Sequence, residues 1–379
     1  MKSIIPTTVS IEQLLAFIDK TLLHKYWKLT ATAIILATTF IFTSPFFNFN
    51  YFDTSSWTLI EQQATDLLTP VYASEESHDA KKIFRLTVPF ISSLLGINRV
   101  GIITLQMLLG VLIIYLLIDL IFKLTAKRTI AFCVGMLAAS SYFCYSAFYD
   151  VFGRVDAFGY FFLILALWFR NPVAIGLSLF LGCFCDERVL VNSSFVFIFW
   201  LMASPKNDNP ERLSFSKIHI AIIIAWGLYF LCRYILISNY GFHTASGGVG
   251  LGTMLQSRHH IPIAVFSTYG LLWIVILAAF GVLIMRRNWL LLSLLGVSII
   301  ISLTVSLLVQ DINRSLAYSF PLLIIAICVL NKYIKYNTLY KNLVLLFAIS
   351  CIVPIYNYDS KIHYQPNILI RLVEVLKNK

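Results

Sequence analysis

Long apolar runs separated by short polar segments dominate this chain. Most runs are about 20 residues long, the length that an α-helix needs to cross a bilayer. They are continuous rather than alternating, which favours helices over the strands of a barrel. The pattern predicts an all-α polytopic membrane protein with about 11 transmembrane helices. The expected spans are residues 29–47, 100–122, 130–149, 157–169, 173–185, 189–203, 218–239, 261–285, 289–309, 316–330 and 342–356.

The polar segments predict the topology. Basic residues in the lead-in 1–28 place the N-terminus in the cytoplasm by the positive-inside rule. The first loop, 48–98, then lies outside, and apolar spacing in 57–68 and 83–95 predicts two amphipathic helices along the membrane surface. The tail 357–379 is also expected outside, and all 379 residues form one transmembrane domain.

Two of the expected helices, 157–169 and 173–185, are too short to span a bilayer alone. At 1.5 Å per residue, each would cover only about 20 Å. The charged segment 186–188 that follows them is therefore expected below the outer surface, inside the protein.

Composition adds a charge asymmetry to this picture. The chain is 59% hydrophobic and has only 18 acidic residues, of which 13 face outward in this topology. The net charge of +11 comes from Lys and Arg scattered in short loops without a basic stripe, which argues against nucleic-acid binding. The seven cysteines lack a metal-binding spacing and fit small buried side chains. The outward acids predict a polar site at one membrane face.

Asp53 opens the first outer loop, directly after Tyr51 and Phe52. Loss of water beside an aromatic wall raises the pKa of a carboxylate, which suits a general base that accepts a hydroxyl proton. The alternative is an N-cap for the helix expected from residue 57 onward, and one residue can fill both roles.

Cations accompany the second surface helix. Arg85 stands between Phe84 and Leu86, where it would either reach lipid headgroups or bind a phosphate with two hydrogen bonds. His78 and Asp79 are too few for a metal site, so no metal site is predicted and Asp79 is assigned to a substrate pocket.

Three further charged groups are the candidates for the rest of that pocket. Three consecutive charges at membrane depth are costly and commonly functional, so the segment 186–188 is the strongest of them. The groups at 150–156 and 311–314 also fit structural salt bridges. The residues concerned are Asp150, Asp156, Asp186, Glu187, Arg188, Asp311 and Arg314.

A glycine-rich loop, 240–260, ends in Arg258, His259 and His260. No strand precedes the glycines and no Gly-Lys-Ser/Thr follows them, which argues against a phosphate-binding P-loop. A lid over a cleft at the membrane face, with His259 and His260 in the substrate pocket, fits better. An ordinary mobile loop is the alternative.

The order of these features resembles the GT-C class of bacterial membrane glycosyltransferases, which use polyprenyl-phosphate sugars. One helix comes first, followed by a long outer loop that opens on an acid and contains an Arg-x-x-x-Pro segment. An acidic outer turn, a Glu-Arg pair and a late Asp-x-x-Arg before a proline come later. The residues that carry the resemblance are Tyr51, Phe52, Asp53, Arg85, Pro89, Asp150, Asp156, Glu187, Arg188, Asp311, Arg314 and Pro321.

The resemblance implies a GT-C-like fold that moves a hexose or pentose from a polyprenyl-phosphate donor to a glycan or lipid-linked acceptor. It implies that Asp53 is the catalytic base and that Arg85, Arg188 or Arg314 binds the donor phosphate. It also implies a multi-pass protein of the bacterial plasma membrane whose active face is periplasmic or extracellular. The first loop has no Asp-x-Asp or Glu-x-Asp pair, so neither a divalent metal nor another cofactor is assigned.

Two other classes stay open. A transporter or flippase for lipids or glycans requires inverted repeats, broken helices at the midplane or a polar path across the bilayer. Here the charges gather near one face, and only Asp119 and Arg233 fall inside expected spans. A non-catalytic membrane subunit of a polysaccharide assembly system also fits, because a fold does not establish an activity.

Overall fold

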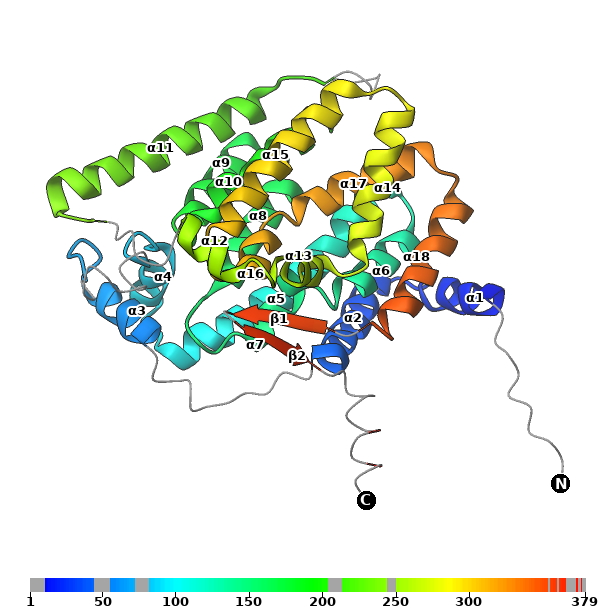
Figure 1. Cartoon of the computed structure of the whole chain (residues 1–379), viewed down its shortest axis with the longest axis horizontal. Coiled ribbons are helices and arrows are strands. Elements are labelled where there is room, and N and C mark those ends of the chain that lie inside the picture. Colours follow the sequence, from blue (N-terminus) through cyan, green and yellow to red (C-terminus); the bar gives the residue numbers. More distant parts are fainter. Residues whose placement is uncertain are drawn as a thin grey trace.

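The computed structural model describes residues 11–43, 55–71, 82–203, 213–243, 250–353, 355–359 and 361–365, with positions 373 and 376. Figure 1 shows the described helices gathered into one bundle, with a two-stranded hairpin against its lower side. Apart from this hairpin, which lies at the end of the chain, the predicted all-α architecture is confirmed for the described residues.

The helices are numbered in chain order. They are α1 (Ile11–Thr21), α2 (Trp27–Thr43), α3 (Ser55–Thr65), α4 (Thr87–Leu95), α5 (Arg99–Thr125), α6 (Arg128–Ala138), α7 (Tyr142–Tyr149), α8 (Asp156–Trp168), α9 (Pro172–Cys183), α10 (Arg188–Met202), α11 (Lys217–Tyr240), α12 (Leu251–Ser257), α13 (Ile261–Tyr269), α14 (Leu272–Met285), α15 (Trp289–Leu307), α16 (Ile312–Ala317), α17 (Pro321–Tyr333) and α18 (Tyr336–Ser350). The strands are β1 (Ile355–Asp359) and β2 (Lys361–Gln365).

Three described helices, α5, α11 and α15, are long and apolar enough to cross a membrane. Counting each of two bent helix pairs as one span raises the number to five, and five shorter apolar helices accompany them. The chain is therefore a multi-pass helical membrane protein. The count of eleven spans stays a prediction.

Two expected spans are bent in the structure. Residues 130–149 form α6 and α7, which meet at 58°, and residues 261–285 form α13 and α14, which meet at 87°. Gly270 separates the second pair with a φ of 52° and a ψ of −127°, a conformation that side chains with a Cβ rarely adopt. A continuous apolar run does not reveal such a break, so the sequence predicted each span without its bend.

The two short helices are present almost as predicted. α8 and α9 pack against each other, and Asn171 begins α9 as its N-cap by accepting the backbone N–H of Val173 at 2.9 Å. Pro172 occupies the first helical position, where a missing N–H costs nothing. Asp186 follows α9 and is only 2% exposed, so it lies inside the protein as expected, whereas the Glu187 side chain is 34% exposed.

The helices of the first loop differ from the prediction in one boundary and in their packing. α4 begins at Thr87 rather than residue 83, because Pro89 is tolerated in a first helical turn but not in a helix interior. Trp57 of α3 and Val88 of α4 are each 1% exposed and pack in one cluster with Phe158 of α8. One apolar face of this helix pair therefore contacts protein, although the sequence predicted contact with the membrane surface.

The C-terminal segment adds an antiparallel hairpin to the bundle. β1 pairs with β2 in a register that puts Ile355 opposite Gln365, and β1 packs against α13 and α16. The sequence predicted a helix as far as residue 356, whereas α18 ends at Ser350. The hairpin therefore lies beside α16, the short helix that carries Arg314.

Basic side chains collect at the end of the bundle where α5, α14 and α17 finish and α18 begins, on the right and top in Figure 1. We call this the basic end. Its described members include Lys28, Lys123, Lys127, Arg128, Arg286, Arg287 and Lys332.

Candidate functional site

A network of arginines and carboxylates occupies the opposite end of the bundle, which we call the network end. Asp156 is at its centre, with a fully buried side chain at the start of α8. Its carboxylate accepts hydrogen bonds from Arg314 (Nη2, 3.0 Å, and Nε), from Arg188 (Nη2, 3.3 Å) and from the Tyr318 hydroxyl (2.9 Å). Arg314 also contacts Asp311 at 3.0 Å. Asp156 thus links α8 to α10 and α16.

The turn between α9 and α10 supplies the second half of the network. Asp186 accepts two hydrogen bonds of 2.6 Å from the guanidinium of Arg188, and Arg85 reaches the same carboxylate at 2.9 Å. Burial alone would raise the pKa of Asp186, but the two guanidinium groups outweigh burial and hold the pKa below its usual range. Asp186 is therefore charged at neutral pH and anchors both arginines.

Asp150 has a different role from the other acids. Its carboxylate accepts the backbone N–H groups of Phe152 (3.0 Å) and Val155 (2.8 Å), and Val155 has a left-handed φ of 54°. Burial of the Asp150 carboxyl raises its pKa. Asp150 therefore holds the turn that positions Asp156 through hydrogen bonds to the backbone of that turn.

Glu187 is the most exposed acid of this cluster, at 34% of its side chain. It lies 3.9 Å from Arg85 and 3.6 Å from Arg233, a residue of α11. The Arg233 guanidinium stacks over the Phe84 ring at 4.0 Å and donates to the Tyr229 hydroxyl at 2.8 Å. Two arginines from distant segments therefore converge on one half-exposed carboxylate.

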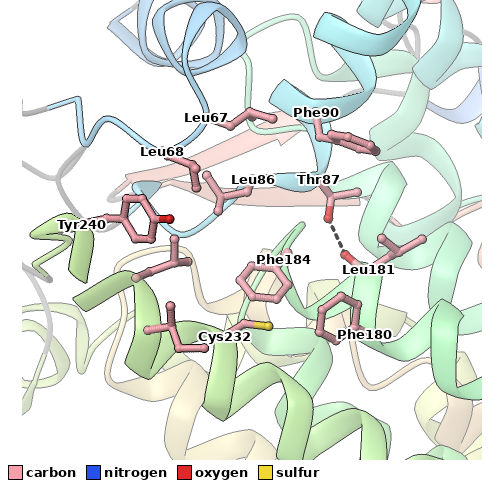
Figure 2. Close-up of a pocket in the computed structure, with 12 residues that line it drawn as sticks. Leu67, Leu68, Leu86, Thr87, Phe90, Phe180, Leu181, Phe184, Cys232 and Tyr240 are labelled. Carbon is pink, nitrogen blue, oxygen red and sulfur yellow. Dashed lines mark hydrogen bonds between the residues drawn. The ribbon is translucent and has the colours of Figure 1, made fainter. Parts of the chain in front are cut away.

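An apolar groove of about 410 Å³ is lined by residues next to these two arginines in the chain. Figure 2 shows its walls, in which the Thr87 hydroxyl donates to the Leu181 carbonyl at 2.7 Å. Leu86 directly follows Arg85 in the wall, and Cys232 directly precedes Arg233. The lining residues are Leu67, Leu68, Leu86, Thr87, Phe90, Phe180, Leu181, Phe184, Cys232, Ile235, Leu236 and Tyr240.

The groove lies beside a helix that is long and apolar enough to cross a membrane. One wall is α11, one of the helices that can span a membrane, and most of the α11 surface does not contact protein. Leu231, Tyr234 and Ile237 of this helix are among its exposed apolar side chains. A long apolar molecule in the bilayer can therefore enter the groove beside Arg85 and Arg233.

The remaining predicted site residues lie elsewhere. Asp53 and Asp79 fall outside the described residues. His259 is exposed and accepts from Arg258 at 3.1 Å, and His260 is half-buried at the start of α13, which packs against α16. Across the described part of the chain, no group of three His, Cys, Asp or Glu side chains is arranged to hold a metal ion.

Two contacts of the site were missed from sequence. Arg233 was noted as a charge within a span but was not assigned to the site, although a charge at membrane depth is itself a functional indication. Tyr318 donates to Asp156 from a position 162 residues later, and no local pattern indicated it. Both residues contact predicted site residues only because of the way the helices pack.

The site combines acids, cations and an apolar groove, and its function is inferred from this geometry alone. No protein-family model, curated protein or solved structure matches the chain. Chemically, Arg188 and Arg314 are held by buried carboxylates, whereas Arg85 keeps a buried Nε without a hydrogen-bond partner among the described residues. Arg85 therefore retains donor capacity beside the groove.

Proposed function

We propose that this protein is a membrane glycosyltransferase that moves a sugar from a polyprenyl-phosphate donor to a glycan or lipid-linked acceptor. The observation that carries the proposal is the apolar groove that opens beside Arg85 and Arg233. A lipid-linked phosphate has a long apolar chain and an anionic group, and the groove and the two guanidinium groups match these two parts. The proposed location is the bacterial plasma membrane, with the network end outside.

The donor phosphate is assigned to Arg85 and Arg233. Arg188 and Arg314 are 11% and 5% exposed and are bound to Asp186 and Asp156, so they serve the frame of the site. At the groove, half-exposed Glu187 occupies the place between the two arginines that an incoming phosphate would take. Arginine suits this role because its planar donors match phosphate oxygens.

The proposed reaction is a displacement at the anomeric carbon of the sugar. The acceptor hydroxyl oxygen forms a bond to that carbon while the bond from the carbon to the phosphate oxygen breaks. The lipid phosphate leaves with the electron pair, and the two arginines stabilise its growing negative charge. The hydroxyl proton passes to a carboxylate, for which we propose Asp53 in the first loop.

The decisive experiment is sugar transfer from a labelled polyprenyl-phosphate donor by the purified chain and its Asp53→Asn variant. Removal of a general base costs about 10² to 10⁴ in rate. The variant should therefore lose transfer and keep its melting temperature. Asp66→Asn is the matched control, because Asp66 lies in the same loop but only caps an exposed turn at Thr69.

A second arm of the same assay tests the phosphate contact. Arg233→Gln should raise the KM for the donor about 10- to 100-fold, the loss expected for a hydrogen bond to a charged group. The KM of Arg233→Lys for the donor should fall between the values of the unmodified protein and Arg233→Gln. Near-normal transfer by Asp53→Asn removes that residue from the mechanism, and absence of transfer by the unmodified chain with any polyprenyl-phosphate sugar contradicts the proposed function itself.

A second candidate function is favoured by one observation. The bent pairs α6–α7 and α13–α14 are similar to the broken helices that transporters place near their substrate sites. Proteoliposomes with a fluorescent polyprenyl phosphate distinguish the two functions. Movement of the lipid between leaflets without sugar transfer would favour the flippase.

A further inference from the structure

A separate cavity of about 280 Å³ lies at the basic end, between helices from distant parts of the chain. Its wall is mostly apolar, and its polar side chains are Asn288, Asn331 and Lys332. The Asn288 side-chain oxygen accepts the backbone N–H of Leu291, which leaves the NH₂ group of this amide as a donor. The lining residues are Leu124, Phe199, Met202, Ala203, Leu283, Asn288, Leu291, Cys328, Val329, Asn331, Lys332 and Tyr333.

Two cations lie over an aromatic ring that lines this cavity. Arg286, directly after α14, and Lys332, in the last turn of α17, lie over the same Tyr333 ring at 5.1 Å and 4.8 Å from its centroid. Both side chains are exposed, and neither forms an ion pair with a described residue. A cation–π contact stabilises a cation but leaves its charge uncompensated.

Other cations at the basic end are engaged differently. Lys28 and Lys123 both contact Asp119, and Arg128 donates to the carbonyls of Leu22 and Leu23. Arg286 and Lys332 thus share one aromatic ring, and neither pairs with a described acid. Such an arrangement favours an anion.

We infer that this cavity binds an anionic phospholipid, with the phosphodiester between Arg286 and Lys332 and an acyl chain along the apolar wall. The mostly apolar lining and the position between membrane helices favour a lipid over a free anion. By the positive-inside rule, the lipid comes from the cytoplasmic leaflet. This site is at the opposite end from the proposed transferase site, and its occupancy can be measured without sugar transfer.

The test is native mass spectrometry of the full-length chain in detergent, titrated with phosphatidylglycerol or phosphatidylcholine. The unmodified protein should retain phosphatidylglycerol in preference to phosphatidylcholine. Arg286→Gln with Lys332→Gln should weaken the phosphatidylglycerol affinity about 25-fold, or about fivefold for each cation. The matched control is Arg170→Gln with Lys341→Gln, which removes two exposed cations from outside the cavity and should change the affinity less than twofold.

A third variant tests the cavity independently of charge. Cys328→Phe places a larger side chain against the lining and should reduce phosphatidylglycerol retention while every cation stays in place. An equal loss in the Arg170 and Lys341 control, or full retention by Cys328→Phe, would overturn the site in favour of diffuse surface attraction. Displacement of the lipid by millimolar glycerol 3-phosphate would overturn it in favour of a soluble anion.

Discussion

The two ends of the bundle carry cations in opposite surroundings. At the network end, the side chains of Arg188 and Arg314 are almost fully buried and contact Asp186 and Asp156. At the basic end, exposed Arg286 and Lys332 share the ring of Tyr333 and form no ion pair with a described residue. Arg188 and Arg314 are therefore structural partners of acids, whereas Arg286 and Lys332 remain available to an external anion.

This difference follows from the cost of burying charge. A buried arginine is tolerated only when a carboxylate and further hydrogen bonds compensate its lost hydration. Asp156 compensates Arg314 in this way, and the Tyr318 hydroxyl donates a further hydrogen bond to Asp156. An exposed cation keeps its water and needs no partner. Arg188, Arg314 and their acids should therefore be sensitive to single neutral substitutions, and Arg286 and Lys332 should not.

The largest effect is expected from Asp156→Asn. The change leaves Arg188 and Arg314 without their shared carboxylate in a buried site. Loss of one partner from a buried ion pair costs about 3–5 kcal/mol. Denaturant unfolding of the purified protein in micelles measures this loss.

Glu61→Gln is the control for that substitution. Glu61 and Arg99 form a bidentate pair, but their side chains are 39% and 24% exposed. An exposed pair contributes about 0.2–1 kcal/mol. Equal losses of unfolding free energy for Asp156→Asn and Glu61→Gln would show that burial does not determine how much an ion pair contributes to stability.

The sequence predicted which charged residues form the network better than it predicted which of them contact one another. Charges at 150–156, 186–188 and 311–314 were recognised because they interrupt apolar runs at helix ends. The contact between Asp156 and Arg314 joins residues 158 positions apart and depends on the packing of α16 beside the bundle. Local apolar spacing contains no information on such a distant pair.

The same limit explains the errors in the fold. Residues 157–169 were assigned correctly because apolar length and a following Asn-Pro define that helix. The bend at Gly270 is invisible in a run whose residues are apolar on both sides. The groove beside Arg233 was also unpredictable, because α4, α9 and α11 contribute its walls from distant parts of the chain.

An effect of intermediate size on the free energy of unfolding is expected from Asp186 when the pH of the solution is lowered. Because the folded-state pKa of Asp186 lies below its unfolded value of about 3.9, its stabilising contribution is fully present above that value. The contribution is lost as the pH falls through the folded-state pKa, at about 1.4 kcal/mol for each unit of the difference. The stability gap between the unmodified protein and Asp186→Asn should therefore narrow as the pH falls below about 4.

The measurement compares the unfolding midpoints of the two proteins between neutral and acidic pH. Asp66→Asn is a second comparison, because Asp66 is exposed and its pKa is lowered by hydrogen bonds from Thr69 and Leu68, not by an arginine of the network. A gap between the unmodified protein and Asp186→Asn that stays constant through the acidic range would show that Arg85 and Arg188 do not lower the Asp186 pKa.

The smallest effect is expected from Lys332→Gln at the basic end. Lys332 and Arg286 are like charges on one ring, so removal of Lys332 should leave the free energy of unfolding unchanged or raise it by about 0.2–0.5 kcal/mol. The measurement uses neutral detergent without anionic lipid, and added salt should reduce any gain by screening. Lys341→Gln, which changes an exposed cation on α18, is the control. A loss of more than about 1 kcal/mol, as for a compensated pair, would mean that Lys332 stabilises the fold as the arginines of the network do.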